Sequence, residues 1–100
     1  MKLVEAIIKP AKLDEVKEAL QELGVAEIVE SEVTSHFSRK IETMSYRGAE
    51  CLVDFIRKIR LEVVAADELV SRVVKTIGSI AGTGQREDCR ILILTSIDAY

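Results

Sequence analysis

The stretch between Pro10 and Gly24 carries the strongest structural signal in the chain. Its apolar residues recur at the three- and four-residue spacing of one helix face, and charged residues occupy the opposite face. The apolar positions are Leu13, Val16, Leu20 and Leu23. Proline is tolerated in the first turn of a helix, and glycine readily adopts the positive φ that often ends one. We therefore expect an amphipathic helix over residues 11–23, which must cover an apolar surface formed by the rest of the chain.

Four further segments predict β-strands. They are residues 3–9, 26–37, 59–63 and 91–94. The first two contain many β-branched residues, and residues 59–63 alternate strictly between apolar and polar side chains, as a half-buried strand does. Residues 91–94 are apolar throughout, so we expect this strand to be central in a sheet, with both faces buried.

A second amphipathic helix is expected over residues 69–80. Its apolar face comprises Leu69, Val70, Val73, Val74, Ile77 and Ile80. Residues 66–68, Ala-Asp-Glu, offer an N-cap and an acidic first turn, which the helix dipole favours. The element order is then βαββαβ, the ferredoxin-like arrangement of the α+β class, in a single domain of residues 1–100.

Two helices can cover only one face of a four-stranded sheet, so the other face needs a role. We expect it to mix apolar residues with charged ones. Its charged members are Glu30, Glu32, Arg60 and Glu62. Such a face is either solvated or buried in an oligomer, and the frequency of symmetric assembly favours an oligomer.

Two polar segments, residues 38–54 and 82–90, predict loops. The first exceeds the roughly 12–15 residues that are usual in compact domains, which indicates a functional loop.

Composition and motifs exclude several functional classes. A net charge of −3 argues against a general nucleic-acid binder. No apolar run approaches the roughly 20 residues of a membrane span. Glu5 lies where a signal peptide would stay apolar, so a cytoplasmic protein is expected. The single histidine, His36, argues against a structural zinc site, and no catalytic triad or G-x-x-x-x-G-K phosphate loop is found.

Six segments together resemble the P-II nitrogen-regulatory family. They are residues 5–10, 12–20, 46–50, 53–55, 58–64 and the pair Thr83-Gly84. Each segment alone is a weak signal, but their order and spacing match the family without a gap from residue 1 to about residue 94.

The resemblance implies a homotrimer with a long T-loop at about residues 37–55 and a shorter B-loop at about residues 82–90. Family members bind ATP or ADP in clefts between subunits, often with 2-oxoglutarate and magnesium. The T-loop then acts on a transporter or channel, an enzyme or a transcriptional partner. By this analogy the protein meets a membrane only through a channel partner.

The resemblance also assigns residues to each role. Those at the effector site are Ile7, Lys58, Glu62, Val64, Thr83, Gly84, Asp88 and Arg90. Those of the T-loop that contact a partner are Arg39, Lys40, Tyr46, Arg47, Gly48, Ala49, Glu50, Cys51 and Asp54. Lys58 has the clearest role, because the family uses this position to bind a ligand carboxylate.

The residues before the T-loop depart from the family pattern. A glycine-rich turn normally lets the backbone approach the phosphates, but here residues 35–37 read Ser-His-Phe, which adds side chains. The family continues with Arg and Gln, the Gln holding magnesium, whereas this chain has Ser38 and Arg39. An arginine has no lone pair for a metal, so 2-oxoglutarate sensing with magnesium is not expected and no metal ligand is assigned.

The B-loop departs as well, because the family's Gly-Asp-Gly-Lys is replaced by residues 87–90, Glu-Asp-Cys-Arg. Arg90 can bind phosphate in place of lysine, whereas Glu87 adds a carboxylate that repels a polyphosphate. The sequence stops at Tyr100, before the family's Arg-x-Arg segment. Each lost charged hydrogen bond weakens binding by about 1.5–3 kcal/mol. Weak ATP binding is therefore expected, with ADP, AMP or a small anion as alternatives and no obligatory cofactor.

Three side chains in these loops allow more than one interpretation. Cys51 replaces the tyrosine that the family uridylylates, which excludes that modification, and Ala49 excludes serine phosphorylation. Cys51 and Cys89 are either reduced cytosolic thiols or a redox-controlled bond between the two loops, which needs Cα atoms within about 7 Å. His36 is either a pH-sensitive group at the base of the T-loop or simply half buried.

Two functions of different class follow. The first is a regulatory protein that senses a nucleotide or small anion and reports through residues 37–55. The second is a scaffold of the same fold that has lost effector binding. A metabolite-dependent affinity for a partner separates the two, and an enzyme is not expected because the sequence offers no catalytic residues.

Overall fold

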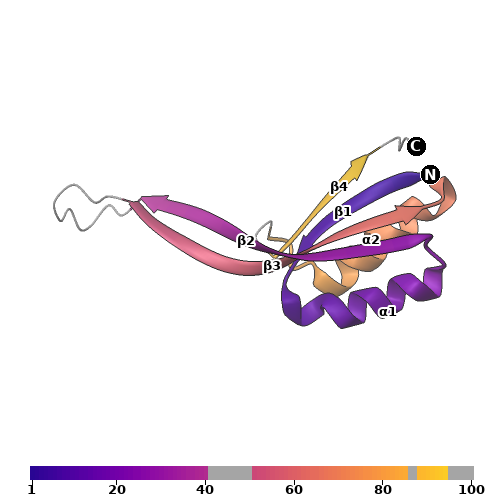
Figure 1. Ribbon diagram of the computed structural model, residues 1–100, viewed down its shortest axis with the longest axis horizontal. Helices are drawn as coiled ribbons and strands as arrows, with labels where there is room; N and C mark the ends of the chain where they lie inside the picture. The colour runs from indigo at the N-terminus through magenta and orange to yellow at the C-terminus, as the bar shows by residue number, and fades with distance from the viewer. Residues whose placement is uncertain (41–50, 86–87, 95–100) are drawn as a thin grey trace.

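The computed structural model describes residues 1–40, 51–85 and 88–94, and for residues 37–40 and 51–54 it describes the backbone only (Figure 1). The described residues form two helices and four strands, with a 3₁₀ turn before each helix, which makes eight elements in all. They are β1 (Lys2–Ile8), η1 (Pro10–Lys12), α1 (Leu13–Leu23), β2 (Glu27–Lys40), β3 (Cys51–Ala65), η2 (Asp67–Leu69), α2 (Val70–Ala81) and β4 (Cys89–Leu94). The βαββαβ order predicted from the sequence is confirmed.

One antiparallel sheet organises these elements, in the strand order β2-β3-β1-β4. Both helices lie against the same face of the sheet (Figure 1), which gives the ferredoxin-like α+β architecture. None of the helices in the described part of the chain is long and apolar enough to cross a membrane.

The first helix forms where its periodicity predicts, and its ends follow local chemistry. Pro10 opens a 3₁₀ turn, because a residue without an N–H fits a helix start, and α1 proper begins at Leu13. Gly24 ends the helix in the left-handed conformation with φ of 80°, and its N–H donates to the carbonyl of Gln21. A side chain at Gly24 would be strained in this conformation.

The core lies between the helices and the covered face of the sheet. Its fully buried large side chains are Val4 and Ile8 of β1, Val16 and Leu20 of α1, Leu61 and Val63 of β3, and Val73 and Ile77 of α2. Six of these eight are apolar positions of the two predicted helices and of the alternating strand, and Val4 and Ile8 come from the first predicted strand, so periodicity identified much of the core.

The strand register corrects the expected placement of two glutamates. Glu30 lies opposite Leu61, a core residue, and therefore belongs to the helix-covered side of the sheet, as does Glu32 opposite Ile59. Glu30 Oε1 accepts a hydrogen bond from Lys17 Nζ of α1 at 2.8 Å. These two carboxylates lie at the edge strand, where the helices leave room for a charged group.

The uncovered side, called the open face below, carries Arg60 and Glu62 as expected. Both alternate with the buried residues of β3, and their side chains approach at 4.0 Å between Arg60 Nε and Glu62 Oε1. Apolar residues from the neighbouring strands share this face, among them Leu3, Ile7 and Leu92.

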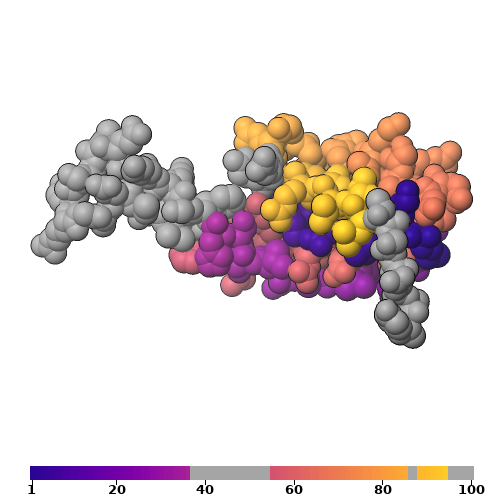
Figure 2. Space-filling view, turned by 90° about the horizontal axis from the view of Figure 1, so that it is seen from above, coloured from indigo at the N-terminus to yellow at the C-terminus, as the bar shows by residue number. Residues whose placement is uncertain are grey.

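The prediction that residues 91–94 form a central strand is wrong. β4 pairs only with β1 and lies at the edge of the sheet, and Figure 2 shows it at the surface. Leu92, Ile93 and Leu94 are 53%, 44% and 42% exposed. An apolar run predicts burial on both faces but does not say which molecule supplies the cover, so an edge strand that a second subunit covers has the same composition.

The predicted loop at residues 38–54 is shorter than expected, because strands enter it from both sides. β2 runs on to Lys40 and β3 starts at Cys51, and the pairing continues beyond Ile59, the last residue of β3 that pairs with β1. Residues 33–40 and 51–58, called the hairpin arm, project from the body (Figure 1). Residues 33–37 were predicted as strand, whereas residues 38–40 and 51–54 lack the apolar alternation by which a half-buried strand is identified, so the sequence pattern missed the outer part of the arm.

The N-cap expected at residues 66–68 is also absent as a side-chain contact. Ala66 precedes the 3₁₀ turn η2 without a capping hydrogen bond from its side chain. The Asp67 carboxylate instead pairs with the N-terminal ammonium of Met1 at 3.1 Å. The acidic first turn itself is confirmed by Asp67 and Glu68.

We predict that Leu20→Ala lowers the free energy of unfolding by about 2–5 kcal/mol, the usual cost of removing a buried leucine side chain and leaving a cavity. Leu20 is fully buried between α1 and the sheet. Chemical denaturation followed by circular dichroism measures the change. Gln21→Ala, at the next and exposed position of the same helix, is the control and should change stability by less than about 0.5 kcal/mol. Equal effects of the two substitutions would contradict this assignment of the core.

Candidate functional site

The end of β1 and the start of β4 meet the middle of β3 and bring charged side chains together. Ile8 of β1 lies opposite Ile59 of β3 and Cys89 of β4. Lys9, Lys58 and Asp88 are the next residues on these three segments. Because neighbouring positions across a sheet share a face, their side chains converge on the open face.

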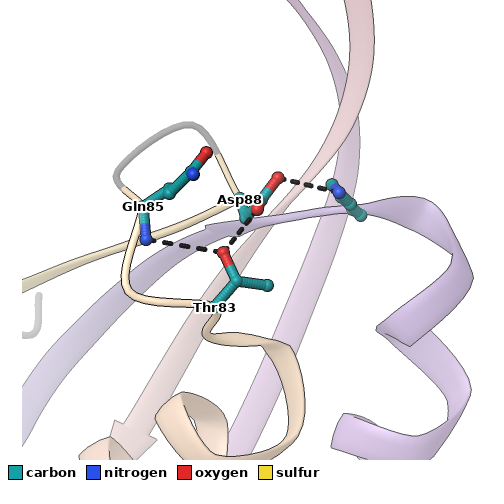
Figure 3. Close-up of polar contacts among 4 residues, drawn as sticks. Thr83, Gln85 and Asp88 are labelled. Atoms are coloured by element: carbon teal, nitrogen blue, oxygen red, sulfur yellow. Dashed lines mark hydrogen bonds and ion pairs between the residues drawn. The ribbon is translucent and has the colours of Figure 1, made fainter.

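Asp88 is the centre of this cluster, and both of its carboxylate oxygens are engaged (Figure 3). Oδ1 accepts from Lys9 Nζ at 2.8 Å, and Oδ2 accepts a hydrogen bond from the Thr83 hydroxyl. The same hydroxyl oxygen accepts from the Gln85 N–H at 3.4 Å, and the Asp88 N–H donates to the Gln85 carbonyl at 3.1 Å. We call the contacts among Lys9, Thr83 and Asp88 the Asp88 clasp.

The electrostatics of the clasp favour the ionised carboxylate. The hydrogen bond from Lys9 lowers the pKa of Asp88, and the hydrogen bond from Thr83 lowers it further. The positive charges of Lys9 and Lys58 act in the same direction. The Asp88 side chain is 17% exposed, whereas that of Lys9 is 53% exposed. Lys9 therefore retains access to solvent while it holds a largely covered anion.

Lys58 is buried, with 5% of its surface exposed. It is the one charged residue in the buried class among the described residues. A buried ammonium needs compensating charge or hydrogen bonds, and its charge acts on the Asp88 carboxyl. The register places Lys58 next to Val33 at the root of the hairpin arm. Lys58 therefore lies at the root of the arm and close enough to the B-loop for its charge to act on Asp88.

Arg90 lies beside two hollows on β4. The larger, of about 480 Å³, is lined by Arg90, Cys89, Gln85 and the glycines of the B-loop and of α2. The smaller, of about 220 Å³, lies on the open face and is lined by Glu5, Ile7, Arg90, Ile91 and Leu92. Gly84 has φ of 87°, a conformation that side chains rarely adopt. The exposed guanidinium of Arg90 in β4 therefore lies beside B-loop backbone that a ligand can approach closely.

The B-loop ends two residues earlier than predicted, because Cys89 and Arg90 belong to β4. Burial raises the pKa of the Cys89 thiol, which favours the neutral form at neutral pH. Glu87, predicted to repel polyphosphates, lies outside the described residues.

The structure brings six of the eight predicted effector-site residues to one end of the sheet. They are Ile7, Lys58, Thr83, Gly84, Asp88 and Arg90. Glu62 and Val64 share the open face but lie further along β3, opposite Glu5 and Leu3. Val64 is six residues from Lys58, which corresponds to about 20 Å along a strand. A single chain therefore does not assemble all eight residues around one ligand.

Lys9 is the site residue that sequence reasoning missed. Its signal was present, because it ends the first strand just before Pro10 and Asp88 comes just before the last strand. Antiparallel pairing of the first and last strands makes these two ends adjacent. The pairing itself depends on the tertiary fold, so the contact could not be read from either segment alone.

The partner-binding residues predicted for the T-loop lie on or beyond the hairpin arm. The backbone of Arg39 and Lys40 is in β2, and that of Cys51 and Asp54 is in β3. The other five, residues 46–50, lie outside the described residues.

The interpretation of Cys51 and Cys89 as a bond within one chain is wrong. Cys89 lies level with Ile59 across β1, and Cys51 lies eight residues further along β3, which corresponds to about 26 Å. A disulfide needs Cα atoms within about 7 Å. Cys89 is a free thiol.

His36 is exposed, so the expectation that it is half buried is also wrong. Its ring packs edge-to-face on Phe55, with 4.8 Å between the ring centroids. The two residues are direct cross-strand partners within the arm, and Phe55 is 67% exposed.

Comparisons with known proteins agree with this architecture. The model of the family described as Nitrogen regulatory protein P-II matches residues 1–100. A relative named Nitrogen regulatory protein P-II from Rhizobium meliloti is 50% identical over 93% of this chain and 83% of its own length. The protein of that name from Azospirillum brasilense is 48% identical over the same shares. The chain belongs to the P-II family.

Two solved structures from Bacillus subtilis share the P-II fold. A structure of GlnK has a TM-score of 0.76 at 26% identity, covering 93% of this chain and 82% of the other. A GlnK–ATP complex has a TM-score of 0.74 at 22% identity, covering 93% and 78%. In this P-II protein the described residues hold no group of three or more His, Cys, Asp or Glu side chains suited to a metal ion.

We predict that the Asp88 clasp stabilises the fold at neutral pH and loses this effect in acid. The pKa of Asp88 is lower in the folded than in the unfolded chain, so its contribution is present above the unfolded value of about 3.9 and is lost as the pH falls through the lower folded value. Wild type should therefore exceed Asp88→Asn in stability at pH 7, and the gap should close toward pH 3. Denaturant midpoints at both pH values measure it. A gap that widens in acid would contradict the assignment.

Proposed function

We propose that this P-II protein is a signalling protein that binds an adenine nucleotide or a small anion in clefts between subunits and controls a partner through its T-loop. The observation that carries the proposal is that Asp88 of the glycine-containing B-loop pairs with Lys9 and lies within the field of Lys58, while Arg90, two residues further on, lines the hollow beside the same loop. Cations and exposed backbone N–H groups are what phosphate or carboxylate groups require.

The shape and composition of the site support a nucleotide. The hollow beside Arg90 combines glycine backbone with the aliphatic Ile91, and Ile7 lies on the other side of the same arginine. Apolar walls suit a base, whereas the guanidinium can bind a phosphate through two parallel hydrogen bonds. One of the solved structures that share this fold is a GlnK–ATP complex, which supports an adenine nucleotide as the effector.

ADP and AMP are the preferred effectors in this proposal, with ATP binding more weakly. A carboxylate, that of Asp88, already lies among the cations, so each added phosphate charge meets repulsion as well as attraction. Residues 35–37 also lack the family's glycines. Arg39 in place of glutamine removes a ligand for magnesium, and 2-oxoglutarate with magnesium is therefore not part of the proposal.

A homotrimer provides the remaining site residues. Glu62 and Val64 are too far along β3 to share a ligand with Lys58 of the same chain. The exposed leucines of β4, Leu92 and Leu94, and the apolar residues of the open face offer a surface that a neighbouring copy can cover. A cleft between copies then receives Lys58 and Arg90 from one chain and the other residues from the next.

The hairpin arm is the output of the protein in this proposal. Lys58 lies at its root, where a change at the B-loop site can reach β2 and β3. The regulated partner is a transporter, a channel or a metabolic enzyme in or facing the cytoplasm, and no catalytic role is assigned to this chain. The scaffold alternative is not favoured, because it assigns no role to the buried Lys58 or to the hydrogen-bonded Asp88 near it.

We predict that the protein binds ADP with a Kd below about 100 μM (roughly −5.5 kcal/mol), measured by isothermal titration calorimetry. Arg90→Gln should weaken ADP about tenfold or more, the usual effect of removing a charged hydrogen bond. Arg72→Gln, at an exposed position of α2, is the control and should leave the Kd unchanged. Magnesium with 2-oxoglutarate should not tighten binding. The absence of heat with ADP, AMP and ATP alike would sink the effector proposal.

We predict a trimer in light scattering coupled to size exclusion, and its dissociation by Leu92→Glu. Leu92 lies on the open face of the edge strand, so a buried carboxylate there would oppose assembly. Gln21→Glu, which adds the same charge on α1, should remain trimeric. A wild-type monomer, or a Leu92→Glu trimer of unchanged stability, would refute this interface.

A further inference from the structure

The Asp88 clasp places an internal anion among the cations that the proposed effector needs. Asp88 Oδ1 accepts from Lys9 Nζ at 2.8 Å, and the charge of Lys58 acts on the same carboxylate. A phosphate that enters this end of the sheet therefore finds Lys9 already neutralised. It also finds a negative charge held close to the place where its own charge must lie.

The two oxygens of Asp88 serve different partners, which allows one contact to open without the other. Oδ2 bonds to Thr83, and the Asp88 N–H bonds to the Gln85 carbonyl, so both contacts stay within the B-loop. Oδ1 alone reaches outside the B-loop, to Lys9 between β1 and η1. Lys9 is 53% exposed and has a long flexible side chain. Separating it from Asp88 therefore exchanges one exposed ion pair for another and leaves the loop intact.

We propose that the effector's phosphate or carboxylate binds by taking Lys9 from Asp88, and that the charge of Asp88 sets a preference for effectors with fewer negative charges. Asp88 is then a specificity-determining residue rather than a direct ligand of the anion. This inference rests on the proposed effector site. It adds to that proposal an exchange step, in which Lys9 changes partners, and a cause for charge selectivity that lies within the described residues.

The decisive variant is Asp88→Asn, because an asparagine keeps an oxygen that can accept from Thr83 and removes only the charge. Calorimetric titrations of wild type and variant use four probes of rising charge, namely adenosine, AMP, ADP and inorganic pyrophosphate. We expect Asp88→Asn to leave adenosine unchanged within twofold and to tighten ADP and pyrophosphate about tenfold, with a smaller gain for AMP. A tenfold change corresponds to about 1.4 kcal/mol.

The matched control is Asp67→Asn, which removes the same charge from the N-terminal pair beside η2. It should leave all four affinities within twofold, which separates a local effect of Asp88 from a change in net charge.

A double-mutant cycle tests whether Asp88 acts through Lys9. Lys9→Gln should cost more pyrophosphate affinity in the Asp88→Asn background than in wild type, because Lys9 is committed to Asp88 only when the carboxylate is present. Equal costs in both backgrounds would overturn the exchange step. In the wild-type protein, carbon-13 NMR should also show the Asp88 carboxyl signal moving as pyrophosphate is added, and an unmoved signal at saturation would count against the exchange.

The outcomes separate this inference from the function on which it rests. If wild type binds ADP and Asp88→Asn binds it no tighter, or binds all four probes more weakly, Asp88 only orders the loop and the inference fails alone. If wild type binds none of the probes but Asp88→Asn binds pyrophosphate, the inference stands and the effector function fails. If neither protein binds any probe, both are overturned.

Discussion

Antiparallel pairing of β1 with two partners is the constraint on which the rest of the structure depends. β1 is hydrogen-bonded to β3 on one side and to β4 on the other. Its alternate residues Val4, Ala6 and Ile8 provide the floor on which both helices pack. The same pairing aligns the end of β1 and the start of β4 with the middle of β3, so the pattern that builds the core also gathers Lys9, Lys58 and Asp88 at one end of the open face. Core and site cannot be separated in this fold, because a one-residue slip of β1 would remove both.

Side chains of opposite charge pair with each other within the site. Cationic side chains at this end of the sheet can attract an anion. One of them, Lys9, already pairs with a carboxylate of the same chain, that of Asp88. The pair is exposed on the Lys9 side only, so its contribution to stability is modest, and it also occupies a cation that an effector could bind. If an effector must take Lys9 from the Asp88 carboxylate, the affinity of the effector depends on its own negative charge. This links the aspartate of the B-loop to ligand choice without requiring any new cationic residue.

The local elements were predictable because short-range periodicity determines them. The spacing of Leu13, Val16 and Leu20 placed α1, and the strict alternation at residues 59–63 placed the middle of β3. The ends were less predictable. The outer part of the hairpin arm, residues 38–40 and 51–54, was predicted as loop because its sequence shows no apolar alternation. β4 was read as central because composition reports how much of a strand is buried, and not which chain buries it.

By itself the sequence determined the order of the elements, the apolar faces of both helices and membership of the P-II family, since each of these depends on residues close together in the chain or on a pattern along it. Only the tertiary structure decided that Glu30 faces α1, that Cys51 and Cys89 lie far apart, and that Lys9 holds Asp88. These facts depend on the register between strands that are distant in the sequence. Register is selected by the packing of the whole core, and no single segment contains that information.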